Sequence, residues 1–228
     1  MQISPRLLKI ASLIPKSQTL ADVGTDHGYI PAYCLLEKRC EKVIPMDINA
    51  KPLERAKKTL ESLNLTPFAD FRLSDGLSAL PKWEADTIVI AGMGGPLICE
   101  ILEKGKDIVT DDTTLILQPM IAPIETRMYL YNNGFCITDE YVVREEDKFY
   151  NIFVVKKEKS DYDDNDIYIG RNLLKNSPEI IQDYLGYKIR VCEKIINGNL
   201  KSNTPDNIAI QKYQHELSIY NAFLKELI

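Results

Sequence analysis

Residues 22–31, with the sequence DVGTDHGYIP, place two glycines, two acids and a histidine between an apolar run and a helical pattern. The preceding QTLA (18–21) is typical of the end of a strand, and the following IPAYCLLEKR (30–39) is typical of a helix. Gly24 and Gly28 can adopt backbone angles that side chains forbid, and they leave room for another molecule beside the main chain. The segment therefore predicts a βαβ unit whose glycine turn and helix N-terminus bind a nucleotide-like ligand.

Strands and helices alternate on both sides of this turn. The predicted strands are residues 18–24, 42–48, 68–74, 85–92 and 113–119. The predicted helices are residues 4–15, 30–39, 50–63, 95–105 and 124–134. Because amphipathic helices separate apolar, β-branched strands, the sequence predicts an α/β protein with a parallel sheet and helices on both faces.

The alternation ends at residues 135–157, where two strand-like runs are joined by an acidic turn without a helix. The second run must therefore return antiparallel to the first. Five parallel strands followed by an antiparallel hairpin resemble the seven-stranded, Rossmann-like sheet of class I methyltransferases, which use S-adenosylmethionine. Nicotinamide-binding Rossmann domains normally have a sixth parallel strand. The resemblance of layouts implies a methyltransferase domain over residues 1–158.

Residues 159–228 contain no further strand pattern and predict a small C-terminal helical domain. Ser177 can cap a helix that has Pro178 in its first turn. A second helix is indicated by apolar residues that recur every three or four positions, namely Ile210, Tyr213, Leu217, Tyr220, Leu224 and Leu227. The two segments predict an antiparallel, coiled-coil-like helical hairpin. This seam is too short to predict an oligomer, and a monomer is expected.

The composition excludes several classes of protein. No apolar run approaches the length of about 18 residues that a membrane span requires. The five cysteines are scattered without a CxxC pair, and the chain has only two histidines, so neither a disulfide framework nor a metal site is indicated. The net charge of −5 disfavours a protein that coats nucleic acid without discrimination. We expect a cytoplasmic protein with reduced cysteines.

The acids of the glycine turn indicate which ligand it binds. Asp26 stands where a dinucleotide-binding turn has its middle glycine, and it would repel a pyrophosphate. S-adenosylmethionine carries a sulfonium and an ammonium group and no phosphate, so a turn flanked by Asp22 and Asp26 suits it. The alternative is that an acid only caps the turn.

Two more acids end the next strands. Asp47, which follows Gly28 by 19 residues, can accept hydrogen bonds from both hydroxyls of a ribose. Asp75 can hold the amino group of an adenine. The residues predicted to bind S-adenosylmethionine are Arg6, Asp22, Gly24, Thr25, Gly28, Asp47, Ile48, Asp75, Gly76 and Gly92.

The segment AGMGG (91–95) ends the fourth predicted strand, beside the first strand in the expected topology. Its three glycines have a high entropic cost on folding. Either the turn is merely tight, or a flat substrate approaches the backbone there, and we favour the second interpretation. Met93, Gly94 and Gly95 are therefore predicted to bind the substrate.

ADVGTDHGYIP, TIVIAGMGGPLICEIL, LILQP and REEDKFYNIFVV together resemble the TrmK family of bacterial methyltransferases. The likeness extends from Arg6 to about Val155, and the helical tail is similar in kind to the family's C-terminal coiled-coil domain. The resemblance implies methylation of N1 of adenine 22 in tRNA. One departure is Met120, because the resemblance implies Gln-Pro-Asn where this chain has Gln-Pro-Met.

Adenine N1 already carries a lone pair, so positioning should dominate this reaction. Asp26 is the predicted catalytic carboxylate, which would stabilise positive charge developing on the ring. His27 is its predicted hydrogen-bonding or proton-accepting partner, with a structural role in the turn as the alternative. The basic residues of the tail either grip tRNA phosphates or form a solvated helix surface.

Three other functions stay open at this point. One is a nicotinamide-dependent oxidoreductase, which would share the sheet and Asp47. The second is an RNA-binding protein that keeps the pocket without turnover. The third is a methyltransferase that acts on another RNA or on a small molecule, because the core motifs bind the donor and do not identify the acceptor.

Overall fold

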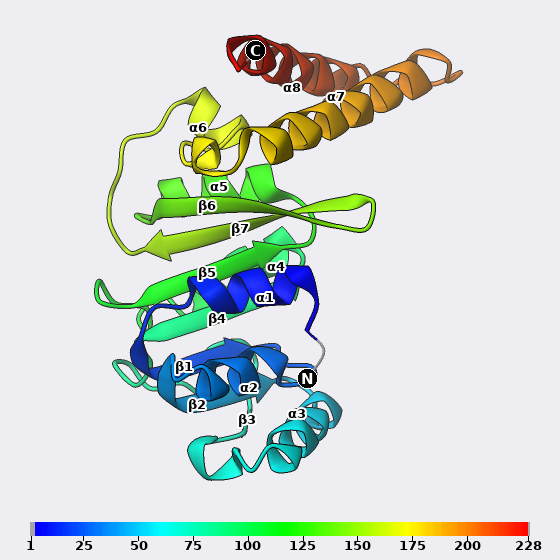
Figure 1. Ribbon diagram of the computed structural model, residues 1–228. Helices are drawn as coiled ribbons and strands as arrows, with labels where there is room; N and C mark the ends of the chain where they lie inside the picture. The colour runs from blue at the N-terminus through cyan, green and yellow to red at the C-terminus, as the bar shows by residue number, and fades with distance from the viewer. Residues whose placement is uncertain (1–2, 228) are drawn as a thin grey trace. The chain divides into compact units, whose positions relative to one another are not determined.

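The computed structural model describes residues 3–227 and contains two compact units, Met1–Asp161 and Tyr162–Ile228 (Figure 1). The sequence placed the boundary after residue 158. No helix among the described residues combines the length and the apolar character needed to cross a bilayer.

The first unit is built on a seven-stranded sheet with the order β3-β2-β1-β4-β5-β7-β6. Its strands are β1 (Ser17–Val23), β2 (Cys40–Asp47), β3 (Arg72–Leu73), β4 (Thr87–Met93), β5 (Thr114–Pro119), β6 (Cys136–Glu145) and β7 (Lys148–Lys156). Strands β1 to β5 are parallel, and β7 pairs antiparallel with both β5 and β6. The predicted fold with its closing antiparallel hairpin is therefore confirmed.

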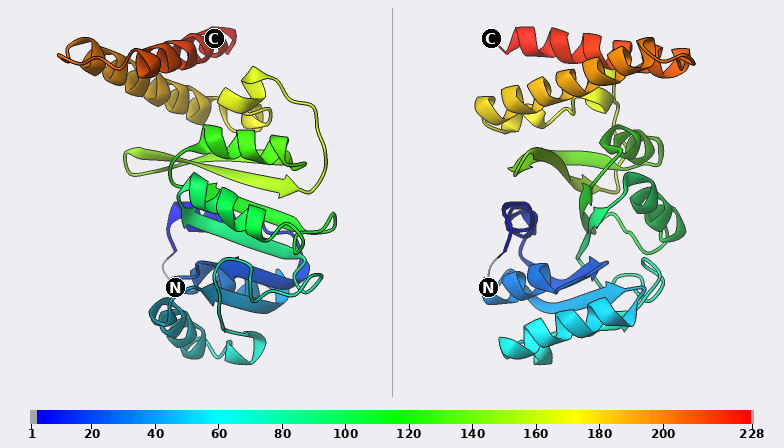
Figure 2. Two further views of the ribbon diagram at one scale, coloured as in Figure 1. Left: turned by 180° about the vertical axis from the view of Figure 1, so that it is seen from behind. Right: turned by 90° about the vertical axis from the view of Figure 1, so that its right-hand side faces the viewer.

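Helices cover both faces of this sheet (Figure 2). The helices are α1 (Pro5–Leu13), α2 (Tyr29–Leu36), α3 (Ala50–Ser62), α4 (Gly95–Lys104) and α5 (Pro123–Asn132). Helix α1 begins where the sequence predicts, because the Ser4 side chain accepts a hydrogen bond from the N–H of Leu7 and Pro5 occupies the first position. Ile10, Ile14 and Leu20 are fully buried in the core between α1, α2 and the sheet.

Strand β3 is shorter than predicted. Phe68, its expected first residue, ends a 3-10 helix, Thr66–Phe68, that has Pro67 in its first turn. Only an isolated bridge between Val43 and Ala69 and a hydrogen bond from Asp70 N–H to Val43 O extend the pairing with β2. The prediction of a strand over 68–74 is wrong for its first part, because Pro67 favours a helical turn there.

The first three residues of the glycine-rich segment 91–95 belong to strand β4. Ala91 pairs with Gln118 and Met93 pairs with Pro119, so Gly92 is an extra residue in the ladder. Gly92 has φ of 75°, which only glycine adopts easily. The predicted turn is therefore a β-bulge, and α4 begins directly after it at Gly95.

The second unit is helical. It consists of α6 (Asp164–Tyr168), a 3-10 helix (Leu173–Lys175), α7 (Pro178–Leu200) and α8 (Asn207–Glu226). The side chain of Ser177 caps α7 and that of Asp206 caps α8. Helices α7 and α8 pack against each other as the predicted hairpin, with Ile210 and Tyr220 buried in the seam. Glu216 is also buried, which the apolar pattern did not predict.

Candidate active site

The glycine turn is fastened to the end of the neighbouring strand. The N–H groups of Gly24 and Thr25 both donate to Met46 O, at 2.8 and 2.9 Å. Gly28 has φ of 67° and precedes α2. A Cβ on Gly28 would lie 3.0 Å from Cα of Ala56 in α3. The second glycine is therefore required by close packing between the turn and α3.

The turn, the first helix and the bulge enclose one cavity of about 280 Å³. Most of the residues that are predicted to bind the methyl donor or to take part in catalysis line this cavity. The lining residues are Arg6, Leu7, Asp22, Gly24, Thr25, Asp26, His27, Gly28, Tyr29, Ile30, Ala91 and Gly92. The fold thus brings residue 6, residues 22–30 and residues 91–92 to one place.

Asp22 is the buried acid of this cavity, with 6% of its surface exposed. Burial, together with the nearby Asp47 carboxylate, raises the pKa of its carboxyl to about 6. An ionised carboxylate in such a position is stabilised by a cation beside it. The electrostatics of the cavity therefore favour a positively charged ligand.

Arg6 provides the opposite charge at the same cavity. Its Nη1 donates to Oε1 of Gln118 at 2.6 Å, and its guanidinium lies 5.3 Å from the ring centre of Tyr150. Its main-chain N–H donates to Oε2 of Glu145 at 3.0 Å. The Nε atom is buried and has no hydrogen-bond partner among residues 3–227. Arg6 therefore brings a positive charge to the lining of the cavity, where a ligand carboxylate can pair with its guanidinium.

Asp26 and His27 lie next to each other, with 3.3 Å between His27 Nε2 and Asp26 Oδ2. The His27 ring stacks on Tyr29, with 5.3 Å between the ring centres. Asp26 also forms an ion pair with Arg55 of α3, which the sequence did not suggest as a site residue. Arg55 is one of several basic residues of α3, so no local signal distinguished it.

The predicted adenosine-binding residues lie outside this cavity. Asp47 accepts the N–H of Asn49 on Oδ1 at 2.8 Å, and Ile48 is 60% exposed. Asp75 and Gly76 line a separate cavity of about 170 Å³. Asp22, Asp47 and Asp75 do lie at the carboxyl ends of three neighbouring strands as predicted, but of these three only Asp22 lines the cavity of about 280 Å³.

The residues predicted for the substrate lie in two environments. A Cβ on Gly24 would overlap the methyl group of Met93, so the Met93 side chain covers the glycine turn. Gly95 is buried, and a Cβ there would lie 2.8 Å from Ala122 O. Close packing alone accounts for Gly95. Gly94 is packed more loosely, because a Cβ added there would lie 3.6 Å from Cγ1 of Ile121.

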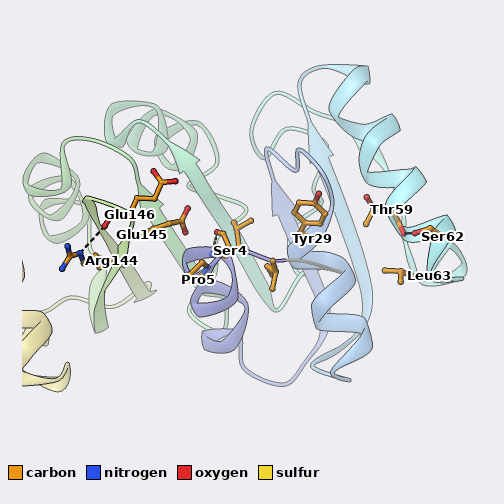
Figure 3. A pocket seen from close by; sticks show the side chains of 11 residues that line it. Ser4, Pro5, Tyr29, Thr59, Ser62, Leu63, Arg144, Glu145 and Glu146 are labelled. Atoms are coloured by element: carbon orange, nitrogen blue, oxygen red, sulfur yellow. Dashed lines mark hydrogen bonds between the residues drawn. The ribbon is translucent and has the colours of Figure 1, made fainter.

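A second, wider groove of about 950 Å³ shares Leu7 and Tyr29 with the cavity (Figure 3). Figure 3 shows Tyr29 between the start of α1 and the residues of α3, with the β6–β7 turn on the other side of α1. The remaining lining residues are Ile3, Ser4, Pro5, Thr59, Ser62, Leu63, Arg144, Glu145 and Glu146. Tyr29 therefore stands where the cavity and the groove meet.

Residues 3–153 match a family model described as a methyltransferase domain. The tRNA (adenine(22)-N(1))-methyltransferase of Bacillus subtilis is 39% identical over 156 residues, which cover 68% of this chain and 66% of that protein. The matched region thus spans about two thirds of this curated relative.

Solved structures are similar over nearly the whole chain. The B. subtilis m1A22 tRNA methyltransferase TrmK has a TM-score of 0.80 and 29% identity, covering 100% of this chain and 99% of that chain. TrmK of M. capricolum, in complex with S-adenosylhomocysteine, has a TM-score of 0.82 and 26% identity, with both chains fully covered.

Proposed function

Because the chain belongs to the TrmK family of S-adenosylmethionine-dependent methyltransferases, we propose that it methylates N1 of adenine 22 in tRNA. The observation that carries the proposal is the cavity at the glycine turn, which a buried acid and an arginine line together. A ligand that carries an ammonium, a sulfonium and a carboxylate matches these charges.

In the proposed donor site, each residue contacts a different part of S-adenosylmethionine. Asp22 attracts the cationic groups, Arg6 binds the carboxylate through its guanidinium, and Gly24 keeps the turn open. Asp47 and Ile48 are proposed for the ribose and adenine, with Asp75 and Gly76 beyond them. When bound, S-adenosylmethionine supplies an electrophilic methyl group on its sulfonium.

In the proposed mechanism the protein positions the acceptor and stabilises charge. Adenine N1 attacks with its own lone pair, so no base is needed to activate it, and orientation dominates the rate. The ring becomes cationic, and the Asp26 carboxylate is proposed to stabilise it. Arg55 and His27 contact Asp26 and hold its carboxylate in place.

The acceptor base is proposed to reach the donor along the wide groove. Tyr29 borders both spaces and presents an aromatic ring, a surface on which an unstacked base can stack. Met93 covers Gly24 and would contact the base or the methyl group from the other side. Gly94 is proposed to keep the approach to the main chain open.

The helical unit is proposed to bind the tRNA backbone. Arg190 and Lys194 are exposed on α7 and can contact phosphates. We further propose that the protein acts as a monomer in the cytoplasm, where tRNA is processed.

The decisive experiment incubates the protein with unmodified tRNA and labelled donor and maps the methylated nucleotide. We expect N1-methyladenosine at position 22. Label in another RNA or in a small molecule would replace the proposed acceptor, and donor binding without any transfer would favour the non-catalytic alternative. A fluorescence titration with NADH tests the oxidoreductase alternative.

Asp26→Ala tests the catalytic assignment. We expect donor affinity close to that of the unmodified protein and a large loss of methylation. Arg55→Ala is the companion variant, because it removes one of the two groups that hold the Asp26 carboxylate and keeps the carboxylate itself, so a smaller loss of methylation is expected. Normal turnover by Asp26→Ala would exclude Asp26 from the mechanism.

A further inference from the structure

Gln118 is a fully buried amide on β5 that lines neither cavity. Its Oε1 accepts two hydrogen bonds, one from Arg6 Nη1 at 2.6 Å and one from Gly92 N–H at 3.1 Å. Its Nε2 donates to Pro119 O at 2.8 Å, which fixes the orientation of the amide. One side chain thus connects a residue of the first helix to the bulge of β4.

The two partners of Gln118 are the parts of the site that most need support. Arg6 comes from α1, and its long side chain is free to take many rotamers unless something holds it. Gly92 is the extra residue of a bulge, so regular strand pairing does not satisfy its N–H. Gln118 supplies the missing acceptor to both.

We propose that Gln118 is a positioning residue for methyl transfer, which aligns Arg6 with the donor carboxylate and holds the Gly92 bulge for the acceptor. Gln118 touches neither ligand and acts only through these two hydrogen bonds. The proposal has two halves. The acceptor half, that Gln118 holds the Gly92 bulge for the acceptor, rests on the proposed function. The donor half, that Gln118 aligns Arg6, requires only that the cavity binds the donor.

The oxygen of an amide suits this task better than a carboxylate. A neutral oxygen orients the guanidinium and leaves its positive charge available to a ligand carboxylate. A carboxylate at the same place would form an ion pair with Arg6 and reduce its attraction for the donor. This difference allows the substitution Gln118→Glu, which keeps an acceptor for Arg6 and Gly92, adds a negative charge and removes the donor to Pro119 O.

The experiment measures S-adenosylhomocysteine binding by calorimetry and steady-state methylation of tRNA for Gln118→Leu. Losing a buried hydrogen bond to a charged group typically weakens binding roughly tenfold or more. We expect the Kd for S-adenosylhomocysteine to rise about tenfold, since Arg6 is released. We also expect kcat at saturating donor to fall, because the Gly92 bulge loses its acceptor.

Asn151→Leu is the matched control. Asn151 is also a buried amide, on β7, and its Nδ2 donates to Glu140 Oε1 at 3.1 Å, away from both cavities. A purely structural role for Gln118 predicts that the two variants lose stability and activity alike. Folded Gln118→Leu with the Kd and kcat of Asn151→Leu would overturn the proposal.

Gln118→Glu and Arg6→Met complete the test. Gln118→Glu should recover kcat relative to Gln118→Leu but still bind S-adenosylhomocysteine weakly, and unchanged affinity in this variant would refute the role even where Gln118→Leu does not fold. In the Arg6→Met background, Gln118→Leu should weaken donor binding little further. Additive losses would show that Gln118 does not act through Arg6.

The binding measurements separate this proposal from the proposed function. If the protein binds S-adenosylhomocysteine but methylates another acceptor, the affinities still decide whether Gln118 aligns Arg6. If the substitutions weaken S-adenosylhomocysteine binding but leave the kcat of tRNA methylation unchanged, Gln118 does not hold the Gly92 bulge for the acceptor. The assignment of tRNA as the substrate then still stands.

Discussion

Gly28→Ala is expected to destabilise the sheet-containing unit by about 2–5 kcal/mol. The backbone of Gly28 has φ of 67°, a conformation that costs a residue with a side chain about 1–2 kcal/mol. The new Cβ would lie 3.0 Å from both Cα and Cβ of Ala56 and 3.0 Å from Cδ1 of Leu60. Because a main-chain atom cannot turn aside, this overpacking adds about 1–3 kcal/mol.

Two other glycines separate the backbone cost from the packing cost. Gly134 has φ of 76° and no atom within 4 Å of its ideal Cβ, so Gly134→Ala should lose only about 1–2 kcal/mol. Gly24→Ala should lose a similar amount, about 1–2 kcal/mol, because the side chain that it meets is the flexible Met93, which can move away. Gly24→Ala should, however, bind S-adenosylhomocysteine more weakly, since Gly24 lines the donor cavity and the added methyl group displaces the Met93 side chain beside it.

Thermal unfolding followed by circular dichroism measures these differences. A chain of this size loses about 2–4 °C of melting temperature per kcal/mol, so we expect a decrease of about 4–20 °C for Gly28→Ala and about 2–8 °C for the others. Below the transition, Gly28→Ala should keep its donor affinity, because the added methyl group points at α3. A melting temperature for Gly28→Ala no lower than that of Gly134→Ala would refute the packing argument.

Three further outcomes are expected. Asp22 keeps its proton to about pH 6 in the folded chain and only to about pH 4 when unfolded, so its ionisation reduces stability as the pH rises between these values. Asp22→Asn should therefore be about 3 kcal/mol more stable in urea unfolding at pH 7, with no gain below pH 4, and should bind S-adenosylhomocysteine poorly; equal gains at both pH values would contradict this assignment. Arg127→Met should cost about 3–5 kcal/mol in the same assay, because it leaves Glu140 buried without its fully buried partner, and Arg127→Met with Glu140→Leu should recover part of the loss. Arg190→Ala with Lys194→Ala should weaken tRNA binding and lower the slope of log K against log salt by about one unit for each phosphate that the protein no longer binds, whereas an unchanged slope would exclude these residues from the interface.

The order of elements could be predicted because short-range signals agree with the tertiary structure. The glycine turn at 22–31, the helical spacing in α7 and α8, and the helix-free connection at 145–148 each depend on neighbours in the sequence. The resemblance to the TrmK family is confirmed by the comparisons. Strand β3 is the exception, because Pro67 and a weak pairing with β2 decide where it begins.

The candidate site was only partly predictable from the sequence. Asp22 and Gly24 stand in a motif, and the structure places them at the cavity as expected. Arg55 and Gln118 reach site residues from elements 26 to 112 positions away in the chain, where their neighbours carry no sign of the contact. Glu216 was missed for a similar reason, since an acid in a polar helix gives no indication that its side chain is buried.

The bulge at Gly92 has a consequence for how the site tolerates changes in length. Side chains on a strand alternate between the two faces, and one added residue reverses that alternation for everything after it. A chain without Gly92 could pair β4 with β5 in unbroken register, but Met93 would then point away from Gly24. The contact between the Met93 side chain and the glycine turn therefore depends on one extra residue in the strand, Gly92.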